Sequence, residues 1–264
     1  MQGLLRSLWD YRFFILSSIK NDFHSRFVRS KLGGFWVILQ PLSQVLIYAF
    51  ILSNLLSSRI QGVEGPYGYA IYLMAGLLAW NLFTEVLDRC MKVFVSNANT
   101  MKKVKFPRIA LPIIAIGSSI VNNVVLFVLI NVIFLALGHA VTPLIGFYFL
   151  LVPIVAILAA GTGIALGVIN VFVRDIEQVV PIIIQVLFWF TPIVYPANVV
   201  PEAYTKILSL SPIYVLVESY HAIFVFGTVP NLAPLAAVTA LGLALCGLAL
   251  FLFRRASADM VDVL

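Results

Sequence analysis

The chain has 264 residues, of which 62% are hydrophobic and 11% are charged, and its formal net charge is +6. A soluble domain is about half apolar and about a quarter charged, so this composition excludes a water-soluble fold, whose surface it could not cover with polar groups. The basic residues lie between apolar runs rather than in one patch, which argues against a nucleic-acid-binding protein.

Residues 1–31 form a basic segment ahead of the first apolar run, and we expect this segment to be cytoplasmic. Apolar residues fall on one side of a helical wheel and polar residues on the other, although Arg12 interrupts the apolar side. This pattern is typical of an amphipathic helix in the membrane interface, where a long arginine side chain can snorkel. A disordered basic tail is the alternative.

Six apolar runs follow, and the fifth of them is just long enough to cross a bilayer, which takes about 20 helical residues. Lipid offers the backbone no hydrogen-bond partner, so each run is expected to be a helix. The sequence therefore predicts an all-α integral membrane protein whose domain of residues 32–264 has six transmembrane helices. The runs are 32–56, 67–87, 109–137, 144–173, 176–195 and 232–253.

The basic residues predict the orientation of these spans. All but two of the 17 lysine and arginine residues fall on one side of the membrane, and the exceptions are Arg59 and Lys206. Because cytoplasmic loops carry an excess of basic residues, both termini are predicted to be cytoplasmic.

The stretch from about 197 to 230 holds two short helix-like pieces, 201–210 and 213–226, separated by Ser211-Pro212. The second piece has about 14 residues, a length typical of re-entrant or interfacial segments. A full crossing here would move Arg254 and Arg255 to the outer side, against the charge bias. We therefore predict a re-entrant outer helical hairpin between spans five and six.

Motifs for chemistry are scarce. The three histidines are scattered without metal-ligand spacing, and no Gly-Lys pair occurs that would indicate a phosphate-binding P-loop. The spans carry neutral polar groups in place of the central carboxylate that ion-driven transport normally needs, which favours an external energy source. Gly163 and Gly167, four residues apart, are interpreted as a helix-packing notch.

Four segments, in order along the chain, resemble the ABC-2 type permeases that export polysaccharides. They are RFVRSKLGGFWVILQPL (26–42), MKKVKFPRIALP (101–112), NVFVRDIEQVVPIIIQVLFWFTPIVYP (170–196) and LSPIYVLVES (210–219).

The resemblance implies a transport subunit with no catalytic residue, metal or cofactor of its own. It implies a homodimer joined to two copies of a separate ABC ATPase, which binds ATP and Mg²⁺. The complex would move an undecaprenyl-linked polymer, such as O antigen, capsule or teichoic acid, across the bacterial inner membrane. Two alternatives stay open: an ABC-2 permease for a drug or lipid, and a membrane enzyme acting on polyprenyl phosphate, with Arg174, Asp175 and Glu177 as its only candidate residues.

The resemblance also makes residues 96–107 a coupling helix that seats in the ATPase. The predicted coupling residues are Asn99, Lys102, Lys103 and Lys105, helped by Arg174 and Asp175. The alternative is that these lysines only set the topology.

A sugar polymer presents apolar ring faces and hydroxyl edges, which suit aromatic and neutral polar side chains. A spacing of four places such residues on one stripe of the first span, and the family places the first and fifth spans around the channel. The alternative is that the stripe only packs helices together. The predicted channel residues are Trp36, Gln40, Gln44, Tyr48, Gln185, Phe188, Trp189 and Tyr195, and Glu218 and His221 form the predicted outer gate.

Overall fold

The computed structural model describes residues 9–28, 39, 42–43, 47, 67–103, 107–139, 142–201, 208–257 and 259–263. All the regular elements in these ranges are helices, which confirms the all-α prediction. Following the predicted topology, we call the end of the bundle near Gly68 the outer end and the end near Ser96 the inner end.

Four helical stretches are long and apolar enough to cross a membrane, and they match predicted spans two, three, four and six. They are α4 (Gly68–Ser96), α6 (Ala110–Ala136), α7 (Tyr148–Phe172) with the preceding 3-10 turn η2 (Pro143–Phe147), and α11 (Leu232–Ala256). Predicted span 32–56 lies almost wholly outside the described residues, so the count of six stays a prediction.

The fifth predicted span is a shorter helix than the sequence suggested. Helix α8 (Ile176–Phe190) has 15 residues, about 22 Å of helix, against a hydrocarbon core of about 30 Å. Thr191 leaves the helical conformation at φ −92° and ψ 132°, as a residue before proline tends to do. Residues 191–195 then turn back against the bundle.

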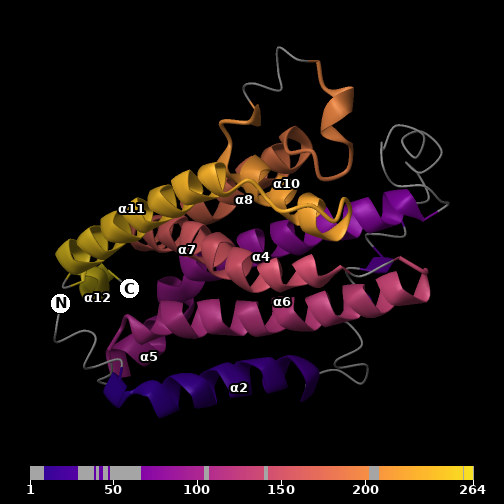
Figure 1. Cartoon of the computed structure of the whole chain (residues 1–264). Coiled ribbons are helices and arrows are strands. Elements are labelled where there is room, and N and C mark those ends of the chain that lie inside the picture. The colour runs from indigo at the N-terminus through magenta and orange to yellow at the C-terminus, as the bar shows by residue number, and fades with distance from the viewer. Residues whose placement is uncertain are drawn as a thin grey trace.

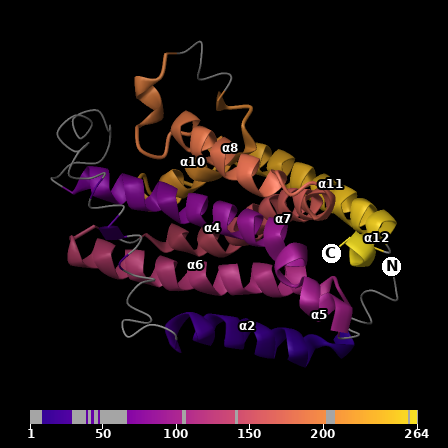
Figure 2. The ribbon, with the colours of Figure 1, turned by 180° about the vertical axis from the view of Figure 1, so that it is seen from behind.

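Helix α4 is the centre of the bundle: 78% of its most apolar stretch is buried, against 33% for α6 and 22% for α11. It packs against both α6 and α7, and α7 in turn packs against α11 (Figures 1 and 2). Glycines allow the close approach of α7 to α4. A Cβ at Gly163 would lie 2.7 Å from the Leu87 carbonyl oxygen, and one at Gly167 would lie 2.6 Å from that of Cys90. The packing notch predicted from the sequence is therefore present.

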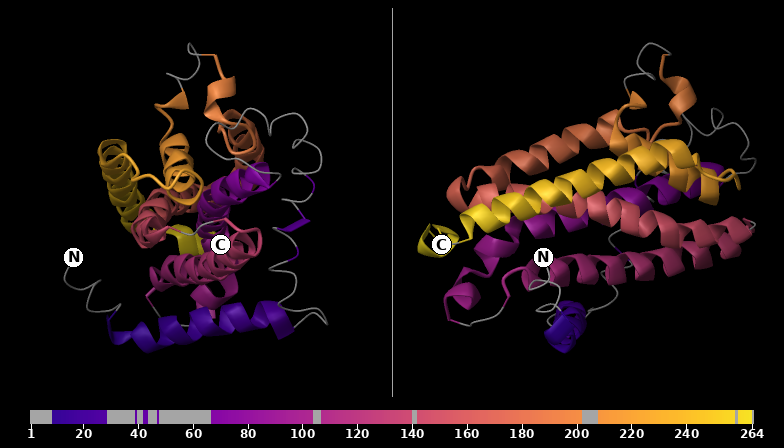
Figure 3. Two further views of the ribbon diagram at one scale, coloured as in Figure 1. Left: turned by 45° about the vertical axis from the view of Figure 1, so that its right-hand side comes forward. Right: turned by 60° about the vertical axis from the view of Figure 1, so that its left-hand side comes forward.

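The helix predicted in the N-terminal segment is confirmed as α2 (Arg12–Val28). It lies across α6 and does not run parallel to the bundle helices. The left-hand view of Figure 3 shows this, since α2 appears there at full length while the bundle helices are foreshortened. Ile15 is buried, and Ile19 lies over Gly117 of α6. Trp9, Phe13 and Leu16 are exposed. Its placement in the plane of the inner interface stays a prediction.

The two ends of the bundle carry short helices. At the inner end, α5 (Ala98–Lys103) packs against α12 (Asp259–Val263), where Met260 is fully buried. At the outer end, η3 (Ala197–Val199) is followed by α10 (Pro212–Phe224), which packs mainly on α4. The second predicted piece of the hairpin is thus a helix, whereas the first lies mostly outside the described residues. Whether the stretch dips into the membrane stays a prediction.

Candidate functional site

The turn after α8 is fixed to the outer end of α4 by two buried tyrosines. The Tyr69 hydroxyl donates to the Val194 carbonyl at 2.7 Å. The Tyr72 hydroxyl lies 3.1 Å from the Pro192 carbonyl oxygen and 3.2 Å from that of Tyr195. The turn therefore finds partners for its carbonyl groups inside the protein, as buried backbone requires.

His221 of α10 completes this junction. Its ring stacks on that of Tyr72 at a centroid distance of 3.8 Å, and its Nε2–H donates to the Tyr72 carbonyl at 3.1 Å. Burial lowers the pKa of the imidazole to about 3, and this hydrogen bond offsets the effect only in part, so the ring is neutral. A Cβ on Gly76 would lie 2.8 Å from Nε2, so the ring fits only because residue 76 is glycine.

A cavity of about 290 Å³ opens beside this junction, between α10, the end of α4 and the chain that follows α8. Glu218 is exposed at its edge, and Tyr214, one helical turn earlier, lines the same cavity. Tyr72, Pro192, Pro196, Ala197, Asn198, Tyr214, Glu218, His221 and Phe226 line the cavity. The two predicted outer-gate residues thus share one cavity, with Glu218 exposed and His221 buried in its wall.

The predicted channel residues of α8 do not share one face. Gln185 and Trp189 are exposed, whereas Phe188 is buried with its ring centroid 5.5 Å from that of Trp80. Tyr195 is partly buried, and its hydroxyl donates to the Trp189 carbonyl at 2.9 Å. The channel residues predicted in the first span, Trp36, Gln40, Gln44 and Tyr48, lie outside the described residues.

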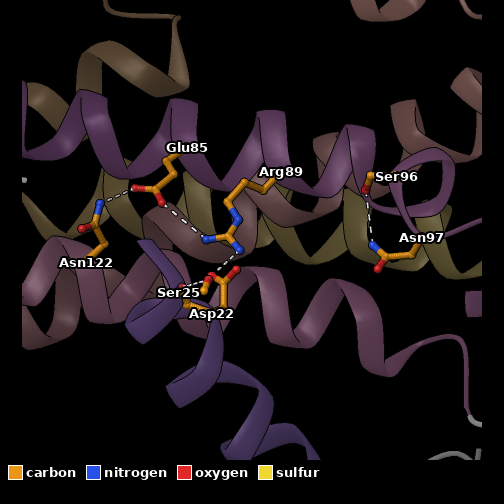
Figure 4. Close-up of polar contacts among 7 residues, drawn as sticks. All are labelled: Asp22, Ser25, Glu85, Arg89, Ser96, Asn97 and Asn122. Atoms are coloured by element: carbon orange, nitrogen blue, oxygen red, sulfur yellow. Dashed lines mark hydrogen bonds and ion pairs between the residues drawn. The ribbon is translucent and has the colours of Figure 1, made fainter. Parts of the chain in front are cut away.

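A second polar cluster joins three helices towards the inner end (Figure 4). Arg89 of α4 lies between two carboxylates: its Nη2 is 2.7 Å from Asp22 Oδ2, and its Nη1 is 3.6 Å from Glu85 Oε1. Asn122 of α6 donates to Glu85 Oε2 at 2.9 Å. The Arg89 guanidinium therefore connects α4 to α2, and the Glu85 carboxylate connects α4 to α6.

The predicted coupling stretch begins where α4 ends. The Asn97 side-chain amide donates to the Val93 carbonyl at 2.8 Å and lies 3.3 Å from the Ser96 hydroxyl, so it caps the last turn of α4 (Figure 4). In α5, Met101 is buried against the protein while Asn99 and Lys102 are exposed.

Of the remaining predicted coupling residues, Arg174 and Asp175 are exposed in the turn between α7 and α8. Lys105 and the side chain of Lys103 lie outside the described part of the chain. Within that part, no group of three or more histidine, cysteine, aspartate or glutamate residues could hold a metal ion.

Comparison with known families decides the family of this helical bundle. The ABC-2 type transporter family matches residues 15–225, which include most of α2 and all of α4 to α8 and α10. The chain belongs to the ABC-2 transporter family. It is 28% identical to an O-antigen export system permease protein, RfbA, of Myxococcus xanthus over 99% of both chains. An RfbA protein of Klebsiella pneumoniae is 27% identical over 96% of both, and the polysialic acid transport protein KpsM of Escherichia coli is 24% identical over 75% of both.

This ABC-2 family member is therefore a multi-pass membrane protein. Two features of its structure were not predicted from the sequence. One is the Arg89 cluster, although Glu85 and Arg89 are spaced by four, a spacing that predicts a pair on one helix face. The other is the pair Tyr69 and Tyr72, which only the return of the chain after α8 brings to their partners. Nothing local in the sequence indicates that return.

Proposed function

We propose that this chain is the membrane subunit of an ATP-driven exporter that moves a lipid-linked polysaccharide outwards across the bacterial inner membrane. Similarity to an O-antigen export permease over 99% of both chains is the observation that carries the proposal. The chain itself would catalyse no reaction.

A separate ATPase is part of the proposal, since no Gly-Lys pair for a P-loop occurs in the sequence. We place the ATPase at the inner end, where α5 exposes Asn99 and Lys102 and the turn before α8 exposes Arg174 and Asp175. The bound ATP and Mg²⁺ would belong to that partner. Two copies of this chain would pair with two copies of the ATPase, with both termini of the permease in the cytoplasm.

The polymer path would run between the copies of this chain. Gln185 and Trp189 on the exposed side of α8 offer an amide and an aromatic face to a sugar chain. The stripe predicted on the first span, Trp36 to Tyr48, would form the facing wall. Glu218 and the cavity beside it would lie at the outer mouth.

The proposal is tested by deleting the gene and measuring surface polysaccharide. Deletion should leave lipid-linked polymer inside the cell, and the wild-type gene should restore its export. The purified chain should also carry a bound ATPase, and export should stop when the ATPase is replaced by a variant unable to hydrolyse ATP. Normal surface polysaccharide in the deletion strain would reject the function.

A further inference from the structure

The outer cavity has the size and shelter of a binding site for a small molecule. Its volume of about 290 Å³ lies at the lower end of the range for small-molecule pockets, about 300–1,000 Å³. A second cavity of about 310 Å³ opens on the other side of Tyr214 and Glu218. The same two side chains therefore line both cavities, and a ligand in either one would meet the Glu218 carboxylate.

Two of the polar side chains that line the cavity, Glu218 and His221, offer hydrogen-bond acceptors. The exposed Glu218 carboxylate has lone pairs that can accept from donors of a ligand. His221 must carry its proton on Nε2, because Nε2 lies 3.1 Å from a carbonyl oxygen. In a neutral ring this makes Nδ1 an acceptor, and the described residues provide it with no hydrogen-bond partner.

The acceptors Glu218 and His221 determine which class of ligand the cavity can bind. Among the described residues that line the cavity there is no lysine or arginine, so a phosphate or carboxylate group would meet the like charge of Glu218 there. A molecule rich in hydroxyl donors would suit both the carboxylate and the imidazole. Pro192, Pro196 and the half-exposed Phe226 supply apolar surface, which matches the C–H faces of a sugar ring.

We infer that this cavity is an exit subsite that binds a neutral saccharide unit, with Glu218 as the principal acceptor and His221 Nδ1 as the second, an inference that rests on the proposed function. The subsite holds the sugar at the outer mouth, so that the polymer leaving the channel is retained between steps. His221 is neutral and stacked on Tyr72, so its acceptor is preformed.

The test uses the permease–ATPase complex in lipid nanodiscs. The probe is a neutral oligosaccharide, released by mild acid from the surface polysaccharide of the bacterium that carries this chain and purified by anion exchange. Titration calorimetry should detect its binding to the wild type. Glu218→Gln should weaken binding about tenfold, because hydrogen bonds to a charged group are the strong ones. Ala197→Trp should abolish binding by filling the cavity.

Controls separate the subsite from a general loss of structure. Asp259→Asn removes an exposed carboxylate at the inner end and should leave binding unchanged. Inorganic phosphate should not bind the wild type. Failure of the wild type to bind the oligosaccharide, or equal binding by wild type and Glu218→Gln, overturns the subsite.

Export of polymer in cells is measured in parallel. If the wild type exports but binding fails these tests, only the subsite is wrong. If the wild type does not export, the proposed function is wrong and the subsite is rejected with it.

Discussion

Asp22 and Arg89, 67 residues apart in the sequence, form an ion pair with 2.7 Å between Oδ2 and Nη2. The two side chains are 33% and 21% exposed, so the pair is only partly screened by solvent. It joins α2, which lies outside the bundle, to α4 at the bundle centre. The pair therefore ties α2 to the helix that leads into α5.

Loss of the Arg89 guanidinium should destabilise the protein more than loss of the Asp22 charge. Arg89→Gln removes the cation that contacts both Asp22 and Glu85, whereas Asp22→Asn leaves Arg89 paired with Glu85. A partly buried ion pair contributes more to the free energy of unfolding than an exposed pair and less than a buried one. We therefore expect Arg89→Gln to lower the free energy of unfolding by about 1–3 kcal/mol. Thermal unfolding of the purified protein in detergent measures the difference.

The matched control for this pair is Asp88→Asn. Asp88 pairs with Lys92 on the same helix at 2.7 Å, and both side chains are more exposed, at 40% and 37%. This variant should unfold within about 0.5 kcal/mol of the wild type. Equal destabilisation by Asp88→Asn and Arg89→Gln would show that the link to α2 adds nothing.

Alanine at Gly163 or Gly167 should push α7 away from α4. The new Cβ would lie 2.7 Å or 2.6 Å from a backbone carbonyl oxygen, and backbone cannot rotate out of the way. Overpacking of this kind costs about 1–3 kcal/mol. Gly247→Ala in α11 is the control, since a Cβ at that position would meet nothing within 4 Å, and a helical alanine should then stabilise by up to about 1 kcal/mol. Thermal unfolding again gives the comparison.

The sequence predicted the long helices well because apolar length and lipid solvent leave one outcome for such runs. It overestimated the length of α8, which ends at Phe190, and the last residues of the predicted span, 191–195, turn and pack on α4 instead. Periodicity did not predict this because the partners of the turn, Tyr69 and Tyr72, lie more than 100 residues earlier.

The candidate sites were predictable to different degrees. Exposed Asn99 and Lys102 follow from a short basic stretch between two spans, which sequence alone identifies. The burial of His221 does not, since it depends on Gly76 making room for the ring. Phe188 and Trp189 are neighbours with similar chemistry, yet only packing against Trp80 decides that one is buried and the other exposed.

The exposed side of α5 should govern association with the ATPase. Replacing Asn99 and Lys102 together by alanine should weaken binding of the ATPase about fivefold to tenfold. This corresponds to a loss of about 1 kcal/mol of binding free energy. Insertion into the membrane should not change, because neither side chain packs on the bundle. Co-purification of the ATPase at increasing dilution measures the effect, with Lys92→Ala, paired on α4, as the control. Unchanged association would mean that Lys102 serves only to set the topology.

The predicted orientation places residue 102 in the cytoplasm and residue 229 outside. Both side chains are exposed, so a cysteine at either position would be open to solvent. In intact cells an impermeant thiol reagent should label Val229→Cys and not Lys102→Cys, and both should react after the cells are opened. The experiment needs Cys246→Ser as its background, whereas Cys90 is fully buried. The opposite pattern of labelling would invert the topology.

The neighbours Phe188 and Trp189 separate a role in export from a role in packing. Trp189 is 52% exposed on α8, so Trp189→Ala should reduce surface polysaccharide several-fold while the unfolding temperature stays unchanged, if its ring faces the polymer. Phe188 is buried against Trp80, so Phe188→Ala should cost about 3–5 kcal/mol and lower the amount of folded protein. Export per folded complex, from quantified surface polymer and purified protein, distinguishes the two. Normal export by Trp189→Ala would remove Trp189 from the path and leave α8 a packing helix.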